Sequence, residues 1–254
     1  KLRAGILGAT GMVGQKYLSL LDENPYFEVT HVVASPTSAG KKYAEAVAGR
    51  WHMPKDLPFA AADLIVHTVD DLDAAADTAT DLGTWLHVDA AYGGAALASP
   101  SARPLFAGIE RCDSFIVDPH KWFFAPFDCC GLLYRDPVNA HETHTQHAAY
   151  LDVTQIRSEW NPADFAHHLT RRARGVPFWF ALAVYGSDAY CDAVQASIDV
   201  AAQTADEIRR HPNLELVMDP ELSVVLYRRR GWDAAAYQSW SDRLLRDQVA
   251  YVTP

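Results

Sequence analysis

Short apolar runs alternate with amphipathic segments along the first half of the chain. The amphipathic segments, at 11–24 and 70–83, have helical spacing, and in the second the apolar side chains from Leu72 to Leu82 fall on one face before Gly83 ends the pattern. The apolar runs predicted to be strands lie at 4–9, 27–35, 63–69, 85–89, 113–118 and 129–136. Strands that alternate with helices are typical of a parallel sheet covered by helices, so the predicted fold class is α/β.

The second half of the chain has a different pattern. Residues 141–162 are polar and irregular, and we predict a long loop there. A helix is expected at about 178–210, strands near 214–230 and a further helix at about 233–247. The sequence therefore predicts a parallel-sheet, helix-flanked large domain over residues 1–150, followed by a smaller C-terminal α+β region.

Composition and charge narrow the class of protein. The 254 residues are 49% hydrophobic, which is enough for a sizeable core, and the net charge of −10 argues against nucleic acid or an anionic membrane as a partner. Four cysteines show no metal-ligand spacing, and we expect Cys129 and Cys130 to be buried in a strand. No apolar run reaches the roughly 18 residues of a membrane span. We therefore expect a cytoplasmic protein.

A glycine-rich turn joins the first predicted strand to the first predicted helix. Gly8, Gly11 and Gly14 stand three residues apart in GATGMVG. Such glycines allow a tight turn, a close approach to a pyrophosphate and close packing of helix on strand, while the helix N-terminus attracts phosphates. An ordinary glycine-rich turn without a ligand explains the same triplet equally well.

The surrounding sequence gives the turn a family context. The stretch KLRAGILGATGMVGQKYLSLL, with PYFEVTHVVASPTSAGKKYAEAV and GRWHMP after it, resembles the NADP-binding N-terminal segment of aspartate-semialdehyde dehydrogenase over residues 1–69. The resemblance implies that NADP phosphates contact Gly8 and Gly14 and the four residues Thr10, Gly11, Met12 and Val13. It also implies that Ser35 and Ser38 lie near the 2′-phosphate. The cysteine, histidine and arginine motifs of that family's later segments do not appear here.

A lysine and an aspartate suit a different cofactor. A lysine amine forms an imine with the aldehyde of pyridoxal phosphate, whose pyridine nitrogen needs an anionic partner. Asp89 and Lys121 each follow a predicted strand, and the carboxyl ends of parallel strands meet at the edge where ligands bind. The small Ala90 and Ala91 would let a flat ring lie close. On spacing alone, a helix cap or a buried ion pair is the better interpretation of Asp89, and an exposed turn lysine is the better interpretation of Lys121.

The sequence around this pair resembles the group II pyridoxal-phosphate decarboxylases, which include the aromatic-L-amino-acid decarboxylases. LHVDAAYGG and DSFIVDPHKWFFAPFDCCGLLYRD carry the resemblance, which extends over residues 71–254. It implies that Lys121 is the Schiff-base lysine, Asp89 the pyridinium partner and His120 a neighbour of the cofactor phosphate, with Ala91 beside the ring. Tyr150 corresponds to a mobile-loop tyrosine that delivers a proton. Phe127 would face the substrate pocket or a dimer contact.

Together the two resemblances predict a chimera with three parts. These are a Rossmann-like segment at 1–69, a partial pyridoxal-phosphate-binding large domain at 70–150, and a linker with a C-terminal small domain at 151–254. We expect a lyase that decarboxylates an L-amino acid, of aromatic type by the family resemblance alone, with turnover impaired because the family's ring-stacking histidine and phosphate loop have no counterpart upstream. A homodimer is expected by analogy.

Two alternative functions and one alternative site stay open. The chain could be an NADP-binding protein derived from the dehydrogenase, or a folded chain without catalytic activity. His141, His144 and His147 recur every third residue and would admit a metal, but the stretch lacks carboxylate support for the histidines and apolar helical periodicity, so we expect no metal site.

Overall fold

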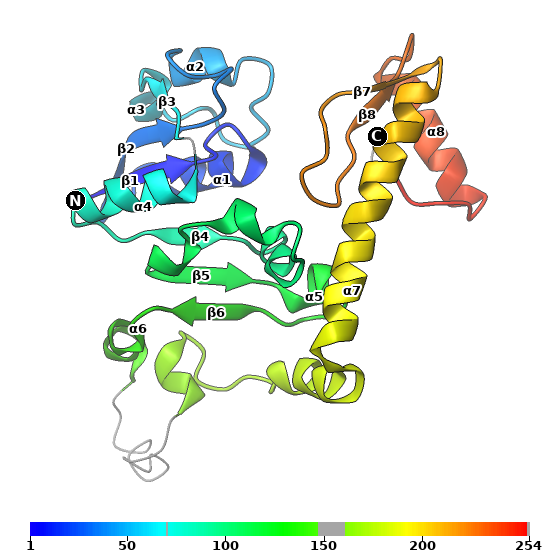
Figure 1. The fold of residues 1–254 in the computed structure, drawn as a ribbon. Helices are drawn as coiled ribbons and strands as arrows, with labels where there is room; N and C mark the ends of the chain where they lie inside the picture. Colours follow the sequence, from blue (N-terminus) through cyan, green and yellow to red (C-terminus); the bar gives the residue numbers. More distant parts are fainter. Residues whose placement is uncertain (70, 147–160, 253–254) are drawn as a thin grey trace. The chain divides into compact units, whose positions relative to one another are not determined.

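The computed structural model describes residues 1–69, 71–146 and 161–252, and the chain forms two compact units (Figure 1). The first unit is Lys1–Trp85 and the second is Leu86–Pro254. Over the described residues, the first unit has one sheet, the second has two, and each unit has its own cluster of buried side chains.

The first unit contains a three-stranded parallel sheet with the order β1-β2-β3. Its elements are β1 (Leu2–Leu7), α1 (Met12–Leu21), β2 (Phe27–Val33), α2 (Tyr43–Ala46), α3 (Phe59–Ala62), β3 (Val66–His67) and α4 (Leu72–Asp81). The helix α4 is capped by Asp71, whose side chain accepts a hydrogen bond from the Ala74 N–H, and its buried alanines lie on the predicted face. The predicted helices at 11–24 and 70–83 are confirmed.

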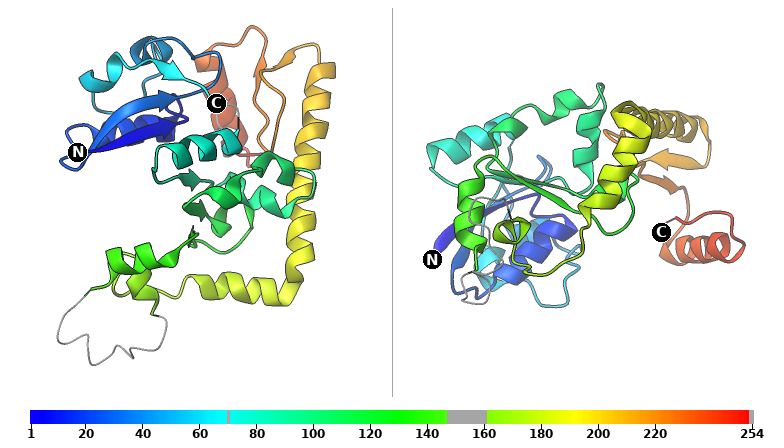
Figure 2. Two further views of the ribbon diagram at one scale, coloured as in Figure 1. Left: turned by 60° about the vertical axis from the view of Figure 1, so that its left-hand side comes forward. Right: turned by 90° about the horizontal axis from the view of Figure 1, so that it is seen from below.

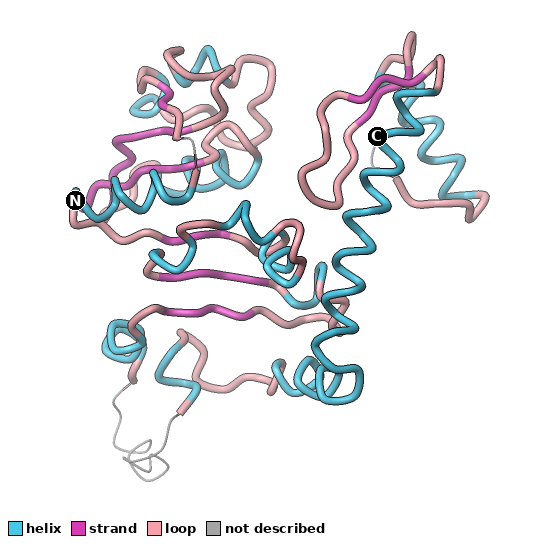
Figure 3. The backbone as a smooth tube through the Cα atoms, viewed as in Figure 1, coloured by secondary structure: helices cyan, strands magenta, loops and turns pink. Residues whose placement is uncertain are grey.

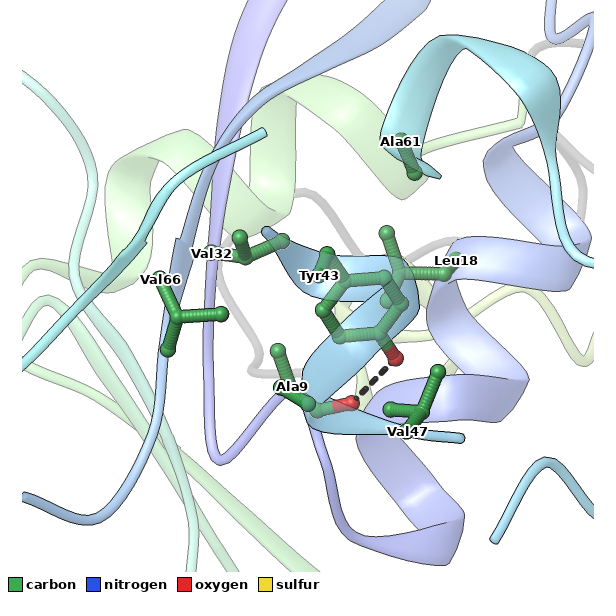
Figure 4. Close-up of a cluster of buried hydrophobic side chains, with 8 residues drawn as sticks. Ala9, Leu18, Val32, Tyr43, Val47, Ala61 and Val66 are labelled. Carbon is green, nitrogen blue, oxygen red and sulfur yellow. Dashed lines mark hydrogen bonds between the residues drawn. The ribbon is translucent and has the colours of Figure 1, made fainter. Parts of the chain in front are cut away.

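Tyr43 fills the centre of the first unit's core (Figure 4). Its ring is fully buried among Leu18, Val32 and Val66, and its hydroxyl donates a 2.7 Å hydrogen bond to the carbonyl oxygen of Ala9. Burial raises the pKa of the Tyr43 hydroxyl to about 12, so the group stays a donor at all physiological pH values. The bond ties the glycine-rich turn to the core.

Two glycines in that turn are required by its geometry. Gly8 has a φ of 72°, in the left-handed region that side chains with a Cβ rarely adopt. A Cβ on Gly14 would lie 2.4 Å from the carbonyl oxygen of Gly8 and 2.6 Å from the Ala9 Cα, so helix α1 packs on the turn only because Gly14 has no side chain. Gly11 has more room, because a Cβ there would lie 3.4 Å from the Gly8 oxygen.

The second unit begins with a mixed three-stranded sheet of order β4-β5-β6 (Figure 3). Strand β4 (His87–Asp89) pairs in parallel with β5 (Ser114–Val117), and β6 (Gly131–Tyr134) adds an antiparallel edge. The other elements are η1 (Gly93–Ala98), η2 (Arg103–Phe106), η3 (Ile109–Arg111), α5 (Pro119–Trp122), α6 (Pro137–His144), η4 (Pro162–Phe165), α7 (Gly175–Arg210), β7 (Leu214–Leu216), β8 (Tyr227–Arg229) and α8 (Ala234–Arg246).

Small residues pack the second unit's core beneath a long helix. Ala95, Ala96 and Ala102 cluster with Trp122 and with Val194 of α7. Beside this cluster, the buried Ser99 hydroxyl bonds to the Gln195 side chain at 2.5 Å, which fixes the 99–101 turn to α7. Helix α7 changes direction at Gly186, where φ is 78° (Figure 2).

The α/β class is confirmed, and three details differ from the sequence-based expectation. Strand β6 runs antiparallel to β5, because it returns directly after the short α5 without a crossover helix. Helix α6 extends to His144, inside the predicted loop, because Asp136 accepts a hydrogen bond from the Val138 N–H and starts a helix there. Of the two cysteines expected in a strand, Cys129 is buried but Cys130 is exposed, and both precede β6. None of the described helices is both long and apolar enough to cross a membrane.

The close packing at Gly14 gives a test of the turn. We expect Gly14→Ala to destabilise the first unit by about 1–3 kcal/mol, because the new Cβ would overlap backbone atoms that cannot move aside easily. Hydrogen exchange followed by mass spectrometry measures this locally, as faster exchange in peptides from 1–69. Gly11→Ala is the matched control and should leave exchange nearly unchanged; equal effects of the two variants would contradict the packing argument.

Candidate functional site

Main-chain hydrogen bonds hold the carboxyl ends of β4 and β5 together. Asp89 pairs with Ile116 in the parallel register, and the Ala90 N–H donates to the Ile116 carbonyl oxygen at 3.2 Å. One step further, the Asp118 N–H donates to the Ala91 carbonyl oxygen at 2.9 Å. Because these bonds continue past the strands, the turns that carry Asp89 and Lys121 leave the same edge of the sheet.

The turn that carries Lys121 is anchored by its neighbours. Trp122 is 4% exposed and stacks on Tyr92, with ring centroids 4.9 Å apart and an interplanar angle of 10°. Tyr92 in turn contacts the Ser223 hydroxyl through its own hydroxyl group. Pro119, at the first position of α5, is buried. Lys121 therefore extends from a turn whose flanking side chains are packed.

Lys121 forms an ion pair that the sequence analysis did not anticipate. Its Nζ lies 2.8 Å from Oδ2 of Asp118, and the side chains are 42% and 13% exposed respectively. Burial alone would raise the pKa of the Asp118 carboxyl, but hydrogen bonds from Lys121 and Cys130 and the lysine charge outweigh it and hold the pKa below its usual value. The sequence signal was the aspartate three residues before the lysine in DPHK.

Cys130 is the second contact of the Asp118 carboxylate. Although Cys130 as a whole residue is exposed, partial desolvation of its thiol is the largest cause that raises its pKa, and the hydrogen bond to Asp118 and the charge of that carboxylate add to it, so that the pKa of Cys130 is about 11. The thiol is therefore protonated at neutral pH and acts as a donor. Cys130 contributes to holding Asp118 and is a poor nucleophile.

His120 and Phe127 contact each other in the segment that carries Lys121 and Cys130. The His120 Nδ1 is 2.6 Å from the Cys129 carbonyl oxygen and 3.2 Å from the Cys129 nitrogen, and the shorter contact favours Nδ1 as the donor. The ring nitrogen Nε2 would then donate to an anion only when the imidazole carries both protons. Phe127 packs edge-on against His120, with centroids 5.1 Å apart, and is 82% exposed.

The carboxylate of Asp128, the residue after Phe127, anchors this segment to more distant parts of the chain. Asp128 is paired with the guanidinium groups of Arg172 and Arg174, the latter with 3.1 Å between Nε and Oδ2. Burial alone would raise the pKa of the Asp128 carboxyl. The hydrogen bond from Arg174 and the positive charges of both arginines outweigh this effect and lower the pKa. Sequence reasoning did not identify this link, because the partners are more than 40 positions apart.

The Asp89 turn is built from small residues. The Ala91 N–H donates to Oδ1 of Asp89 at 3.1 Å, which closes the turn, and Ala90 is buried beneath it. A Cβ on Gly94 would come within 2.8 Å of the Phe115 ring, so η1 lies on the face of β5 only with glycine there. The Asp89 side chain itself is exposed.

In the first unit, the structure leaves the glycine-rich turn accessible. Gly11, Met12 and Val13 are exposed at the start of α1, where the first N–H groups of a helix have no intrahelical partner. The buried Gln15 side chain shapes the turn by donating to the Thr10 carbonyl oxygen at 3.0 Å.

The two serines assigned to the 2′-phosphate differ in exposure. Ser35 is exposed, and its hydroxyl lies 2.9 Å from that of Thr37. Ser38 is only 3% exposed. Ser35 is therefore the better placed of the two to meet a ligand.

One further signal lies in the distribution of lysines. The chain has six lysines, of which five lie at positions 1–55 and the sixth is Lys121. The second unit therefore has a single lysine, and its other long basic side chains are arginines. Tyr150, the predicted proton donor, and His147 lie outside the described residues.

Two family models match the chain, one in each part. Residues 65–230 match the pyridoxal-dependent decarboxylase conserved domain, and residues 3–79 match the NAD-binding domain of semialdehyde dehydrogenases. Because the decarboxylase match covers more than half of the chain, the protein belongs to the pyridoxal-dependent decarboxylase family. Both resemblances stated from the sequence are confirmed.

Characterised relatives agree with this assignment. The chain is 32% identical over 162 residues to an aromatic-L-amino-acid decarboxylase of Bacillus atrophaeus, covering 63% of this chain and 34% of that protein. It is also 32% identical over 162 residues to an L-tyrosine/L-DOPA decarboxylase of Lophophora williamsii, covering 63% and 31%. The chain thus spans about a third of the length of the curated relatives it matches.

Solved structures share the fold. Oryza sativa TDC with PLP and tryptamine matches with a TM-score of 0.72 and 25% identity, over 99% of this chain and 55% of that one. Mouse CSAD in apo form matches with a TM-score of 0.68 and 21% identity, over 99% and 57%.

The Asp118–Cys130 contact predicts how the thiol reacts. With a pKa of about 11, exposed Cys130 should react slowly with iodoacetamide at pH 9, and its rate should rise with pH up to about 11. Asp118→Asn removes the carboxylate charge, so the pKa should fall and alkylation at pH 9 should accelerate several-fold. Peptide mass spectrometry measures this, with Cys191 as the internal reference. An unchanged rate in the variant would show that Asp118 does not hold the thiol.

Proposed function

We propose that the second unit carries part of a pyridoxal-phosphate-dependent amino-acid decarboxylase site, namely the part that contains the lysine. The observation that carries this proposal is the pairing of the β4 and β5 ends, which brings Asp89 and the unit's single lysine to one edge of the sheet. Family membership supports it. Lys121 would hold the cofactor covalently, and Asp89 would face its ring nitrogen.

The residues present fit that cofactor. A primary amine, a carboxylate and an imidazole lie at one sheet edge, and the Lys121 side chain is 42% exposed and so accessible to an aldehyde. Ala90, Ala91 and Gly94 keep the floor of this edge free of large side chains. His120 would meet the phosphate through Nε2, and Phe127 would line the substrate side.

Each residue has a definable chemical task. The chemistry that bound pyridoxal phosphate supplies is a sink for the electrons left on the α-carbon when carbon dioxide departs. Asp89 would hold a proton on the ring nitrogen and so keep that sink strong. The proton that replaces carbon dioxide at the α-carbon needs a donor, the role we assign to Tyr150.

The relatives indicate the class of substrate. The proteins matched are described as decarboxylases of aromatic amino acids, tyrosine, tryptophan and histidine. We propose an L-amino acid, of aromatic type, as the substrate. A homodimer stays a prediction that light scattering would check.

We propose a second function, nucleotide binding, for the first unit. The left-handed Gly8, the close approach at Gly14 and the exposed residues 11–13 form the backbone geometry that admits a pyrophosphate beside a helix N-terminus. The match of residues 3–79 to a semialdehyde dehydrogenase NAD-binding domain supports it. Ser35 would favour the 2′-phosphate of NADP.

The decarboxylase proposal is tested by fixing the cofactor on the chain. Pyridoxal phosphate followed by borohydride should add one pyridoxyl group to the peptide that contains Lys121, and Lys121→Arg should abolish it while keeping the charge. Asp89→Asn should weaken binding by roughly tenfold or more, because a charged partner is lost. Peptide mass spectrometry reads both results directly, since no other lysine lies in the second unit.

Lysines of the first unit provide the background for this experiment. Lys16 and Lys55 are exposed and show how much label a surface lysine takes up. Label on Lys121 no greater than on these two lysines would overturn the proposal.

The nucleotide proposal has its own test. NADPH fluorescence should report binding to the whole chain, and Gly11→Asp should weaken it at least tenfold by placing a negative charge against the phosphates. Phe59→Asp makes the same change in charge on α3, at an exposed position, and should have little effect. Equal binding by all three proteins would refute a site at the turn.

A further inference from the structure

Asp118 occupies a helix-cap position but does not act as a cap. It precedes α5, where an aspartate side chain usually accepts a hydrogen bond from the first turn of the helix. Here its side chain makes no such bond, and its Oδ2 instead lies 2.8 Å from the Lys121 Nζ. The carboxylate is therefore directed at the amine, not at the helix.

The Asp118 carboxylate is itself held from several sides. Its main-chain N–H is bonded to the Ala91 carbonyl oxygen at 2.9 Å, which fixes its backbone to the turn that follows Asp89. The Cys130 thiol donates to its side chain from the segment before β6. With only 13% of the side chain exposed, the carboxylate has little freedom to follow the lysine elsewhere.

We propose that Asp118 is a positioning residue for Lys121, and that its carboxylate holds the lysine amine at the carboxyl edge of β5 whenever that amine is not bonded to a carbonyl carbon. This inference rests on the proposed function and extends it. A lysine has many rotamers, and a fixed anion selects those in which the amine stays at the edge of the sheet. Cys130 supports the effect through its bond to the carboxylate.

The arrangement has two consequences of opposite sign. An ammonium group paired with a carboxylate must leave it and lose a proton before it can attack a small aldehyde, so the pair slows that reaction. A large ligand that must bind at the edge gains from an amine already held there. Removing the Asp118 carboxylate should therefore speed the reaction of Lys121 with a small aldehyde and weaken the binding of a large ligand at the edge.

Reductive methylation of the cofactor-free chain measures the first effect. The lysine nitrogen bonds to the carbon of formaldehyde, one water leaves, and hydride from cyanoborohydride with one proton completes the methylamine. Asp118→Asn should raise the rate at Lys121, relative to Lys16 and Lys55, by roughly threefold to tenfold, as expected for a half-exposed ion pair. Asp118→Glu should restore a slow rate.

A second ion pair provides the matched control. The Nζ of Lys42 lies 2.7 Å from Oδ1 of Asp63 in the first unit, with both side chains more exposed than those at the site. Asp63→Asn should therefore raise methylation of Lys42 by less, and should leave Lys121 unchanged. Thermal unfolding of each variant checks that the fold is retained.

Binding of pyridoxal phosphate measures the second effect. Borohydride-fixed occupancy of Lys121 should require severalfold more pyridoxal phosphate in Asp118→Asn than in the unchanged chain. Methylation of Lys121 at the same rate in both proteins would overturn the positioning role, whether or not the cofactor binds. Faster methylation in the variant, with no cofactor label on Lys121 in the unchanged chain, would support the role of Asp118 and refute the decarboxylase proposal.

Discussion

Two backbone hydrogen bonds beyond the ends of β4 and β5 determine the geometry of the site. The Ala90 N–H bonds to Ile116, and the Asp118 N–H bonds to Ala91, so the parallel pairing continues into the two turns. Because backbone groups make these bonds, the relative positions of Asp89 and Lys121 do not depend on either side chain. Two side chains at strand ends can be placed together this way only if the strands are parallel, since antiparallel strands would put their carboxyl ends at opposite edges.

Contacts from distant parts of the sequence keep this edge rigid. Trp122 is covered by Tyr92 and by Val194 of α7, and the carboxylate of Asp128 pairs with Arg172 and Arg174. These contacts anchor the residues on either side of Lys121 in the sequence through packed rings and ion pairs. The lysine amine is then held by Asp118, so both the backbone and the side chain of Lys121 are fixed.

The two family resemblances coexist because each unit buries its own core. Tyr43 and the side chains around it close the first unit, while Trp122, Val194 and the alanines of η1 close the second. The glycine-rich turn depends on the first core through the bond from Tyr43 to Ala9. The candidate site at the end of β5 depends on the second core. A substitution in one core is therefore expected to affect chiefly the function of its own unit.

The sequence by itself determined the α/β class, both family resemblances and most element positions, since strand and helix periods, glycine spacing and the DPHKW segment are local signals. It also predicted Asp89 and Lys121 as site residues, because the HVDAAYGG and DPHKW segments resemble the decarboxylase family and place the two residues at or just past the ends of apolar strands. Tertiary structure alone decided that Lys121 pairs with Asp118, that Cys130 supports this carboxylate, that Asp128 holds two arginines and that β6 runs antiparallel. The physical reason is that these features depend on which side chains meet after the turns close, and hydrophobic periodicity carries no information about side-chain direction.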